Sequence, residues 1–440
     1  QRIWNERLDL DFDNIRAALD WSLATGHGEM ARRIISSLLL FLDNRGHARE
    51  GLNWASQALD LPDPEGDERA RIGTLRAAGR LSTRVGDYVS SQTYFEQSEA
   101  AAERLGDRKV IAATLNDLAS GPWYRGSWAE SEAKYRRALA LNHELGDRFG
   151  IATSLQGLAV IEALKGDYTL SLHLLDESIV ISRELGNPTQ LLTAIVGKLV
   201  KQIVDAQYDE SDPSLAEALP LAIELQDPWA EASTRHGMAV VARVRGKGDE
   251  ARSHLRRVIE LDRQMGHRQA YAIAVMELGT LELVEERYAQ SAASFLESIG
   301  IFYTGAADRW FVESCDFIAG IALAQHDPET AARLIGYADG FRRRNSIARM
   351  RYYEATYLEI VRQLNAQLDA AEQDRLIEEG RSLDRESAFR LAFDFLASVA
   401  GSPENLRPAK TLTPSPSPDS RRGEPLVASY PLLELGEGGA

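Results

Sequence analysis

The sequence carries glycine at a fixed interval of twenty residues over most of its length. Steps of twenty from residue 26 to residue 326 reach sixteen positions, and eleven of them are glycine: Gly26, Gly46, Gly66, Gly86, Gly106, Gly126, Gly146, Gly166, Gly186, Gly246 and Gly266. With 33 glycines in 440 residues, chance would place about one there. Helices commonly end on a residue with positive φ, where glycine has no Cβ to clash. The series therefore predicts helices of similar length joined by tight turns.

Two further series repeat every forty residues between these turns. The first holds small residues: Gly51, Ser91, Ser131, Ser171, Ser211, Ala251, Ser291 and Ala331. The second, four residues later, is apolar or aromatic: Ala55, Phe95, Tyr135, Leu175, Leu215, Leu255, Phe295 and Ile335. A small residue lets two helix backbones approach, and a large residue on the same face fills the gap made by the next pair. We expect an all-α fold of about eight helix pairs over residues 26–345.

The repeated unit resembles the tetratricopeptide repeat. Gly166-Asp167-Tyr168 with Ser171 matches the turn and second helix of that motif, and Gly86-Asp87-Tyr88 with Ser91 does the same. The period here is forty residues, against roughly thirty-four in the family. Lys198 departs from the pattern at an expected apolar position. The resemblance implies a right-handed α-solenoid in which the first helix of each pair lines a concave groove.

The N-terminal segment, residues 1–25, is predicted to be a lead-in helix that Asp11 or Asp13 could cap. Its stretch Asn14–Trp21, together with Glu50–Trp54, resembles the junction that precedes the repeat array in bacterial STAND-class ATPases fused to LuxR-type or winged-helix transcription factors. Residues 331–336, followed by Arg351-Tyr352-Tyr353-Glu354, resemble the end of the same arrays. The resemblance implies a sensor array that follows a nucleotide-binding part, so we expect a further segment before Gln1.

The period lapses after residue 345. Residues 350–371, 372–382 and 384–399 are predicted to be capping helices that close the array over residues 346–400, with Asp384 as an N-cap. Residues 401–440 alternate proline with serine and end in glycines, a composition that cannot bury enough apolar surface to order the chain. We expect this tail to be disordered.

Composition narrows the class of partner. The formal charge is −16, which argues against direct nucleic-acid contact by this segment. The longest apolar run, residues 38–42, is too short to span a bilayer, and no signal peptide is visible. The one cysteine, Cys315, falls at a predicted core position. We expect a cytoplasmic protein without membrane contact; self-association is left open.

The sequence lacks the motifs of common catalytic sites. It has no phosphate-binding loop, since Gly246–Asp249 lacks both the leading glycine and the hydroxyl residue, and no nucleophile elbow. Its eight histidines form no His-x-x-x-His pair. We therefore expect no enzymatic activity, no cofactor and no metal.

The concave groove implied by the resemblance supplies candidate binding residues: Arg76, Arg80, Arg84, Asn116, Ser120, Trp123, Gln156, His236 and Arg243. The three arginines are spaced four apart and form one stripe on one helix. Such a stripe could hold a carboxylate or an acidic peptide, or it could be a solvated face paired with neighbouring acids. Pro122 falls within a predicted helix and should kink it.

These observations favour a non-enzymatic scaffold that binds a protein, a peptide or a small ligand in the groove. The family resemblance makes it the sensor array of a signal-transduction ATPase or transcriptional regulator. A stand-alone adaptor that binds an extended peptide is the alternative, and an enzyme that uses the concave face is a third hypothesis.

Overall fold

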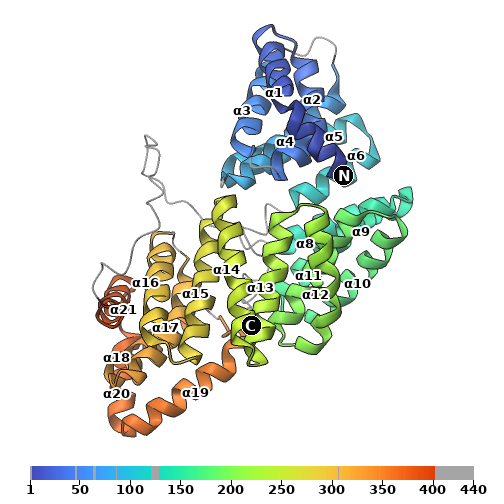
Figure 1. The fold of residues 1–440 in the computed structure, drawn as a ribbon. Helices are drawn as coiled ribbons and strands as arrows, with labels where there is room; N and C mark the ends of the chain where they lie inside the picture. Colours follow the sequence, from blue (N-terminus) through green and yellow to red (C-terminus); the bar gives the residue numbers. More distant parts are fainter. Residues whose placement is uncertain are drawn as a thin grey trace. The chain divides into compact units, whose positions relative to one another are not determined.

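The computed structural model describes residues 2–44, 47–62, 66–85, 87–119, 128–305, 307–345 and 347–401, which are α-helical throughout and contain no strand (Figure 1). The helices are α1 (Arg2–Ala24), α2 (Gly28–Asn44), α3 (Ala48–Asp60), α4 (Glu68–Arg84), α5 (Tyr88–Leu105), α6 (Arg108–Leu118), α8 (Trp128–Leu145), α9 (Arg148–Leu164), α10 (Tyr168–Glu184), α11 (Pro188–Val204), α12 (Tyr208–Glu224), α13 (Pro228–Val244), α14 (Gly248–Met265), α15 (Arg268–Val284), α16 (Tyr288–Thr304), α17 (Asp308–Ala324), α18 (Pro328–Asn345), α19 (Arg351–Gln367), α20 (Ala370–Arg381) and α21 (Arg385–Ala400).

Helices α2 to α18 form the eight predicted pairs, with a period of forty residues. We call the first helix of each pair the A helix and the second the B helix. An A helix packs against its own B helix and against the next A helix, as α4 does with α5 and α6 and as α15 does with α16 and α17. This is the packing of a tetratricopeptide-like array, and the predicted fold class is confirmed.

The corners between helices adopt the conformation that the glycine series predicts. Positive φ occurs at Gly26, Gly66, Gly106, Gly146, Gly166, Gly186, Gly246 and Gly266, and also at the four described positions of the series that are not glycine: Ala206, Gln226, Glu286 and His326. At Glu286 (φ 59°) the amide N–H donates to Leu283 O, and the next N–H, of Arg287, donates to Glu282 O. These two bonds satisfy the last carbonyls of the helix in a Schellman motif. The corner geometry is therefore kept where glycine is absent.

A replacement at one of these corners should change stability through the backbone alone. Glu286→Gly should raise the free energy of unfolding by about 0.5–1 kcal/mol, because a non-glycine residue is strained at positive φ by more than glycine costs in chain entropy. Gly266→Ala is the matched reverse change: its Cβ would meet nothing within 4 Å, yet its φ is 71°. Urea unfolding should show opposite signs for the two variants. A shift in the same direction would contradict this account of the corners.

The two forty-residue series meet in the core as predicted. The serines of the small series are buried, and Ser171 Oγ donates to Ala159 O of the preceding A helix at 2.6 Å. The large series packs against glycines of the following A helix: Gly157 faces Tyr135, Gly197 faces Leu175 and Gly237 faces Leu215. A side chain in place of Gly157 would overlap the tyrosine ring, so the glycine is what allows the helices to stack at this spacing.

Aspartates start several of the helices. Asp107, Asp147 and Asp167 each accept a hydrogen bond from a backbone N–H in the first turn, at 2.9–3.2 Å. Asp384 does the same with Ser387 N at 2.7 Å, as predicted. The predicted cap of the first helix is wrong, because α1 begins at Arg2 and both Asp11 and Asp13 lie inside it. Apolar packing N-terminal to these aspartates, where Leu8 lies against the core that α1 shares with α2 and α3, accounts for the longer helix.

The contacts divide the chain into two compact units. The first comprises Gln1–Ala163, Asp167–Lys198 and Pro220–Asp227, and the second comprises Leu164–Gly166, Leu199–Leu219 and Pro228–Ala440. In the first unit, α1 packs against α2 and α3. In the second, α20 packs against α18, and α21 packs against α16. The predicted tail lies outside the described residues from position 402 onward, and the predicted domain boundaries stay predictions.

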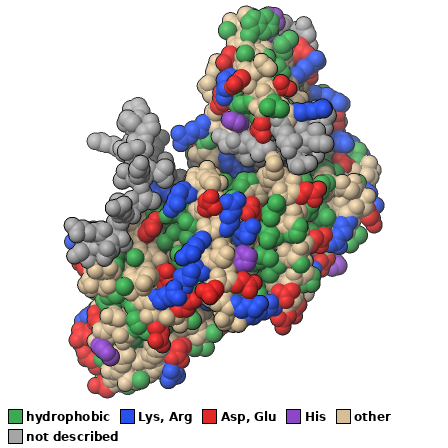
Figure 2. Space-filling model, in the orientation of Figure 1, with side chains coloured by type: hydrophobic (Ala, Val, Ile, Leu, Met, Phe, Trp, Pro, Cys, Tyr) green, Lys and Arg blue, Asp and Glu red, His purple; other side chains and the backbone are tan. Residues whose placement is uncertain are grey.

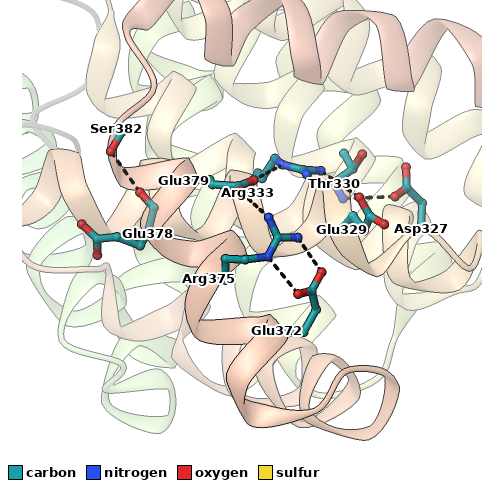
Figure 3. Close-up of polar contacts among 9 residues, drawn as sticks. All are labelled: Asp327, Glu329, Thr330, Arg333, Glu372, Arg375, Glu378, Glu379 and Ser382. Atoms are coloured by element: carbon teal, nitrogen blue, oxygen red, sulfur yellow. Dashed lines mark hydrogen bonds and ion pairs between the residues drawn. The ribbon is translucent and has the colours of Figure 1, made fainter.

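Helix α20 is held against α18 by close backbone approach and by ion pairs. A Cβ at Gly336 would overlap the carbonyl oxygen of Ile377, and one at Gly380 would overlap that of Arg333. Arg333 pairs with Glu379 at 3.1 Å, and Arg375 joins Glu372 to Glu379 on α20 (Figure 3). Exposed ion pairs contribute little, so the two glycines are the main reason why these helices can dock.

Among the described helices, none combines the length and the apolar character that crossing a bilayer requires.

Candidate functional site

The groove residues predicted from the sequence lie on A helices wherever the structure describes them. Arg76, Arg80 and Arg84 are on α4, Asn116 is on α6, Gln156 is on α9, and His236 and Arg243 are on α13. Ser120, Trp123 and the predicted kink at Pro122 lie outside the described residues. The structure brings these side chains together in two places, one in each unit.

In the first unit, two of the three stripe arginines share one carboxylate. Arg76 Nε lies 2.6 Å from Asp117 Oδ2, and Arg80 Nη1 lies 3.8 Å from Asp117 Oδ1. The aspartate, on the neighbouring α6, is 11% exposed, whereas the arginines are 28% and 38% exposed. Both guanidinium groups therefore keep a face in water next to a partly neutralised charge. Arg84 is exposed on the same helix.

The two amide side chains of the predicted set form hydrogen bonds within the array. Asn116 Oδ1 accepts from Ser154 Oγ at 2.9 Å. Gln156 Nε2 donates to Ser178 Oγ at 2.9 Å and to Gln190 O at 3.3 Å. The bonds to Ser154 and Gln190 join successive repeats, and the bond to Ser178 joins the two helices of one pair. At least part of the polar capacity of Asn116 and Gln156 is therefore structural.

In the second unit, His236 and Arg243 converge on a buried carboxylate. His236 Nε2 lies 3.7 Å from Glu277 Oε1, and Arg243 Nη2 lies 3.8 Å from Glu277 Oε2. The hydroxyl of Tyr353, on α19, donates to Glu277 Oε1. Glu277 is 2% exposed and the histidine 3%. The cluster draws on α13, α15 and α19 and is closed to solvent.

The sites at Asp117 and at Glu277 have the same arrangement of an acid and a base on neighbouring A helices. Arg76 and Asp117 are 41 residues apart, and so are His236 and Glu277, four repeats further along the chain. In each pair a cationic or basic side chain of one A helix meets a carboxylate of the next A helix. At the same position the intervening repeats have Gly157, Gly197 and Gly237, which face B-helix side chains. Stacking of the repeats therefore does not require an acid there.

Charge partners keep the buried carboxylate ionised. Burial by itself would raise the pKa of Glu277, but the nearby His236 and the charge of Arg243, together with the Tyr353 hydroxyl, hold that pKa below its usual value. Burial raises the pKa of Tyr353, which keeps the phenol protonated as a donor. The site is an ionised acid held in a dry environment by three partners.

A second buried ionic cluster lies next to it on α17. Arg342 of α18 donates to Glu313 at 2.9 Å and to Asp316 at 2.7 Å. Arg349, two residues before α19, donates to Asp316 at 2.9 Å, and its guanidinium carbon lies 3.2 Å from the ring centroid of Tyr357. Both acids are about 1% exposed. Removing one partner from such a cluster would leave an uncompensated buried charge.

Sequence reasoning missed Glu277 and Tyr353 as members of the site. The signal for the glutamate was present, because a step of 160 residues, four repeats, leads from Asp117 to Glu277. Tyr353 lies in the stretch Arg351–Glu354 that resembles the end of such arrays, but that resemblance assigns it no partner. It follows the last repeat, and only the packing of α19 brings it to α15.

Sequence reasoning also missed Lys201, a lysine in an apolar position. Forty-residue steps place it in line with buried apolar residues: Phe41, Leu81, Ile161, Val241, Leu281 and Ile321. Lys201 is 1% exposed, and its Nζ has no hydrogen-bond partner among the described residues. Burial lowers the pKa of its ammonium group from 10.5 to about 7.

Lys201→Met should therefore stabilise the protein, by about 2–4 kcal/mol near neutral pH. Between about pH 7 and 10.5 the unfolded chain holds a proton on Lys201 that the folded protein lacks, so wild-type stability rises with pH through this window. The difference in the free energy of unfolding between the methionine variant and wild type should therefore decrease as the pH rises from 7 to about 10. Urea unfolding at these two pH values would measure it. Lys198→Met is the control, because Lys198 pairs with Asp176 at 2.6 Å near the surface. An advantage that does not change with pH would contradict the assignment.

The described residues show no assembly that matches a familiar catalytic or metal centre. No three His, Cys, Asp or Glu side chains within them converge so as to hold a metal ion. Burial raises the pKa of the Cys315 thiol, which makes it a poor nucleophile. On the surface, acidic and basic side chains are interspersed (Figure 2), and pairs such as Arg245 with Asp209 and Asp212 account for part of this pattern.

Comparison with known proteins gives a short match to regulators. The chain matches no protein-family model. A stretch of 54 residues is 41% identical to proteins named as HTH-type transcriptional regulators in Mycobacterium bovis and in two strains of Mycobacterium tuberculosis. The match covers 12% of this chain and spans only 6% of the length of each relative.

Comparison with solved structures finds helical-repeat proteins with low sequence identity to this chain. A Rap protein complexed with competence and sporulation factor is 11% identical, with a TM-score of 0.49 over 77% of this chain and 100% of that one. Aspartyl phosphate phosphatase F from Bacillus subtilis is 12% identical, with a TM-score of 0.48 over 81% of this chain and 94% of that one. A kinesin light chain with TPR-like repeats from Podospora anserina is 15% identical, with a TM-score of 0.36 over 46% and 98%.

Proposed function

We propose that the chain is a non-enzymatic scaffold that binds a partner along the face formed by its A helices. The partner is a protein, a peptide or a small ligand, and the array serves as the sensor of a signal-transduction ATPase or a transcriptional regulator in the cytoplasm. In this role, binding biases a switch elsewhere in the same protein, which requires different affinities for the two states of that switch.

The observation that carries this proposal is the repeated acid–base pair on the A helices. Asp117 and Glu277 sit where three other repeats have glycine, so the array could stack without them. Taking a carboxylate out of water is costly even when it is paired. Residues that are costly and not needed for stacking are best explained by binding, and the partly exposed arginines beside Asp117 are placed to meet an acidic group.

The regulator role draws on two supports from the sequence. One is the junction-like stretch Asn14–Trp21. The other is the 54-residue match to HTH-type transcriptional regulators. A stand-alone adaptor would need neither.

Variants of the first-unit site should change the affinity for an acidic probe. Asp117→Asn removes the carboxylate that Arg76 and Arg80 share, so a fluorescein-labelled hexaglutamate peptide should bind about tenfold more tightly, ~1.4 kcal/mol. The double variant Arg76→Glu with Arg80→Glu should abolish that binding. Fluorescence anisotropy at low salt measures both effects.

The matched control for the double variant is Arg136→Glu with Arg137→Glu on α8. It changes the net charge equally but lies on a B helix, where both arginines pair with glutamates. It should reduce binding far less than the A-helix variant. Equal binding by all these proteins would contradict a binding role for the arginine stripe.

The coding sequence upstream of Gln1 tests the regulator role separately. We expect it to encode a phosphate-binding loop followed by a winged helix or another DNA-binding domain. If that region encodes an unrelated protein, the regulator role fails and the adaptor remains. Hydrolysis of ATP above background by the purified chain would overturn the non-enzymatic assignment.

A further inference from the structure

In the second unit, the inner face of the array is already covered by a helix of the same chain. Helix α19 runs across the A helices from the end of α11 to the end of α17. Arg351 Nη1 donates to Asp205 Oδ1 at 2.5 Å just after α11, and Gln367 Nε2 donates to Leu323 O at 3.2 Å on α17. Figure 1 shows α19 running from α20 toward α13.

The contacts of α19 are few and chemically distinctive. Only Tyr352, Tyr353, Ile360 and Leu364 of its seventeen residues are buried. The Tyr353 hydroxyl donates a hydrogen bond to Glu277. Its ring packs against Phe317 with the centroids 4.8 Å apart, and the Arg243 guanidinium carbon lies 5.9 Å from its centroid. Leu358 is 58% exposed on the outer side. A helix with such limited burial can separate at a lower cost than a core helix.

Charge on the covered face is complementary to charge on the helix. The face presents the acids Asp205, Glu277 and Asp316, and the α19 segment meets them with Arg351, Tyr353 and Arg349, respectively. Apolar anchors add to these polar contacts: Ile360 packs on Gly320 of α17, and Leu364 is buried as well. The face therefore selects a helical segment with a tyrosine and two basic side chains, one on the helix and one just before it.

The segment after α19 has its own attachment to the array. Helix α20 docks through Gly336 and Gly380, and α21 docks through Arg385, which pairs with Asp308 at 2.6 Å, and through Phe389, which stacks on Tyr303. Non-helical residues flank α19 on both sides, at 347–350 and at 368–369. Separation of α19 therefore need not detach the helices that follow it.

We propose that α19 is an internal occupant of a binding face on α13, α15 and α17, and that a partner helix with basic and tyrosine side chains competes with it there. This inference rests on the proposed scaffold function and gives that function a partner class and a means of control. While α19 is bound, the apparent affinity for the partner is reduced by the fraction of molecules in which the face is open.

The test uses the full chain with α19 weakened from its own side. Ile360→Ser with Leu364→Ser removes the apolar anchors of α19 and leaves the face unchanged. The probe is a fluorescein-labelled peptide of residues 347–368. We expect the double variant to bind it about tenfold more tightly than wild type, because the competing helix is released. The same peptide with Arg349→Glu, Arg351→Glu and Tyr353→Phe should lose that gain.

Leu358→Ser is the matched control, since it makes the same kind of change on the exposed side of α19 and should leave peptide binding as in wild type. Hydrogen exchange should show loss of protection in α19 of the double variant, with protection retained in α13, α15 and α17. If α19 opens and the peptide still does not bind, or if the three A helices lose protection together with α19, the proposal is overturned and α19 is a structural cap.

Self-association of the double variant through α19 would also overturn the proposed partner class, because the face would then prefer a second copy of this chain. Light scattering after gel filtration would detect it. These outcomes would not contradict the scaffold function, because that function is tested separately at Asp117 in the first unit with a different probe.

Discussion

The structure depends on a backbone conformation that recurs every twenty residues. At the described positions of the glycine series one residue turns to positive φ, and at corners such as Glu286 the last carbonyls of the helix are satisfied by the next two amide groups. Where this short turn recurs, each helix starts at a similar angle to the one before it. A regular angle and length are what allow the small residues of one helix to meet the large residues of the next throughout the array. Positive φ also occurs at Ala206, Gln226, Glu286 and His326, where a side chain makes this conformation unfavourable. Packing of the helices before and after the turn therefore enforces it.

Polar groups divide the inner side of the A helices into structural and binding parts. Gln156 and Asn116 make hydrogen bonds that link repeats, and such bonds require that successive helices keep their register. The acids at 117 and 277 serve no such stacking need. One is partly open beside two arginines, and the other is sealed by an aromatic side chain from α19. The chain thus holds the same arrangement twice: the site at Asp117 is accessible, and the site at Glu277 is occupied by α19. The first site can therefore be compared directly with the second.

Buried charge is concentrated in the second unit. Glu277, Glu313 and Asp316 are all paired with basic side chains, yet buried ion pairs rarely stabilise a fold more than apolar packing of the same volume would. Their value lies in specificity: a carboxylate in a dry site accepts one kind of partner and penalises others strongly. Lys201 shows the cost of a charge without such a partner, because burial shifts its pKa instead.

Local sequence determined much of this protein. The glycine series, the aspartate caps and the two forty-residue series predicted the helices, their pairing and their core, because turn geometry and helix periodicity act over a few residues. The sequence also predicted that Arg76 and His236 would lie on the inner side. The partners of these residues, Asp117 and Glu277, come from the next repeat, and periodicity could have predicted them. Only the tertiary structure decided that α19 folds back onto α13, α15 and α17, since nothing in its local pattern specifies which distant surface its tyrosines will bury. That choice depends on the sum of contacts across four repeats, which no short segment encodes.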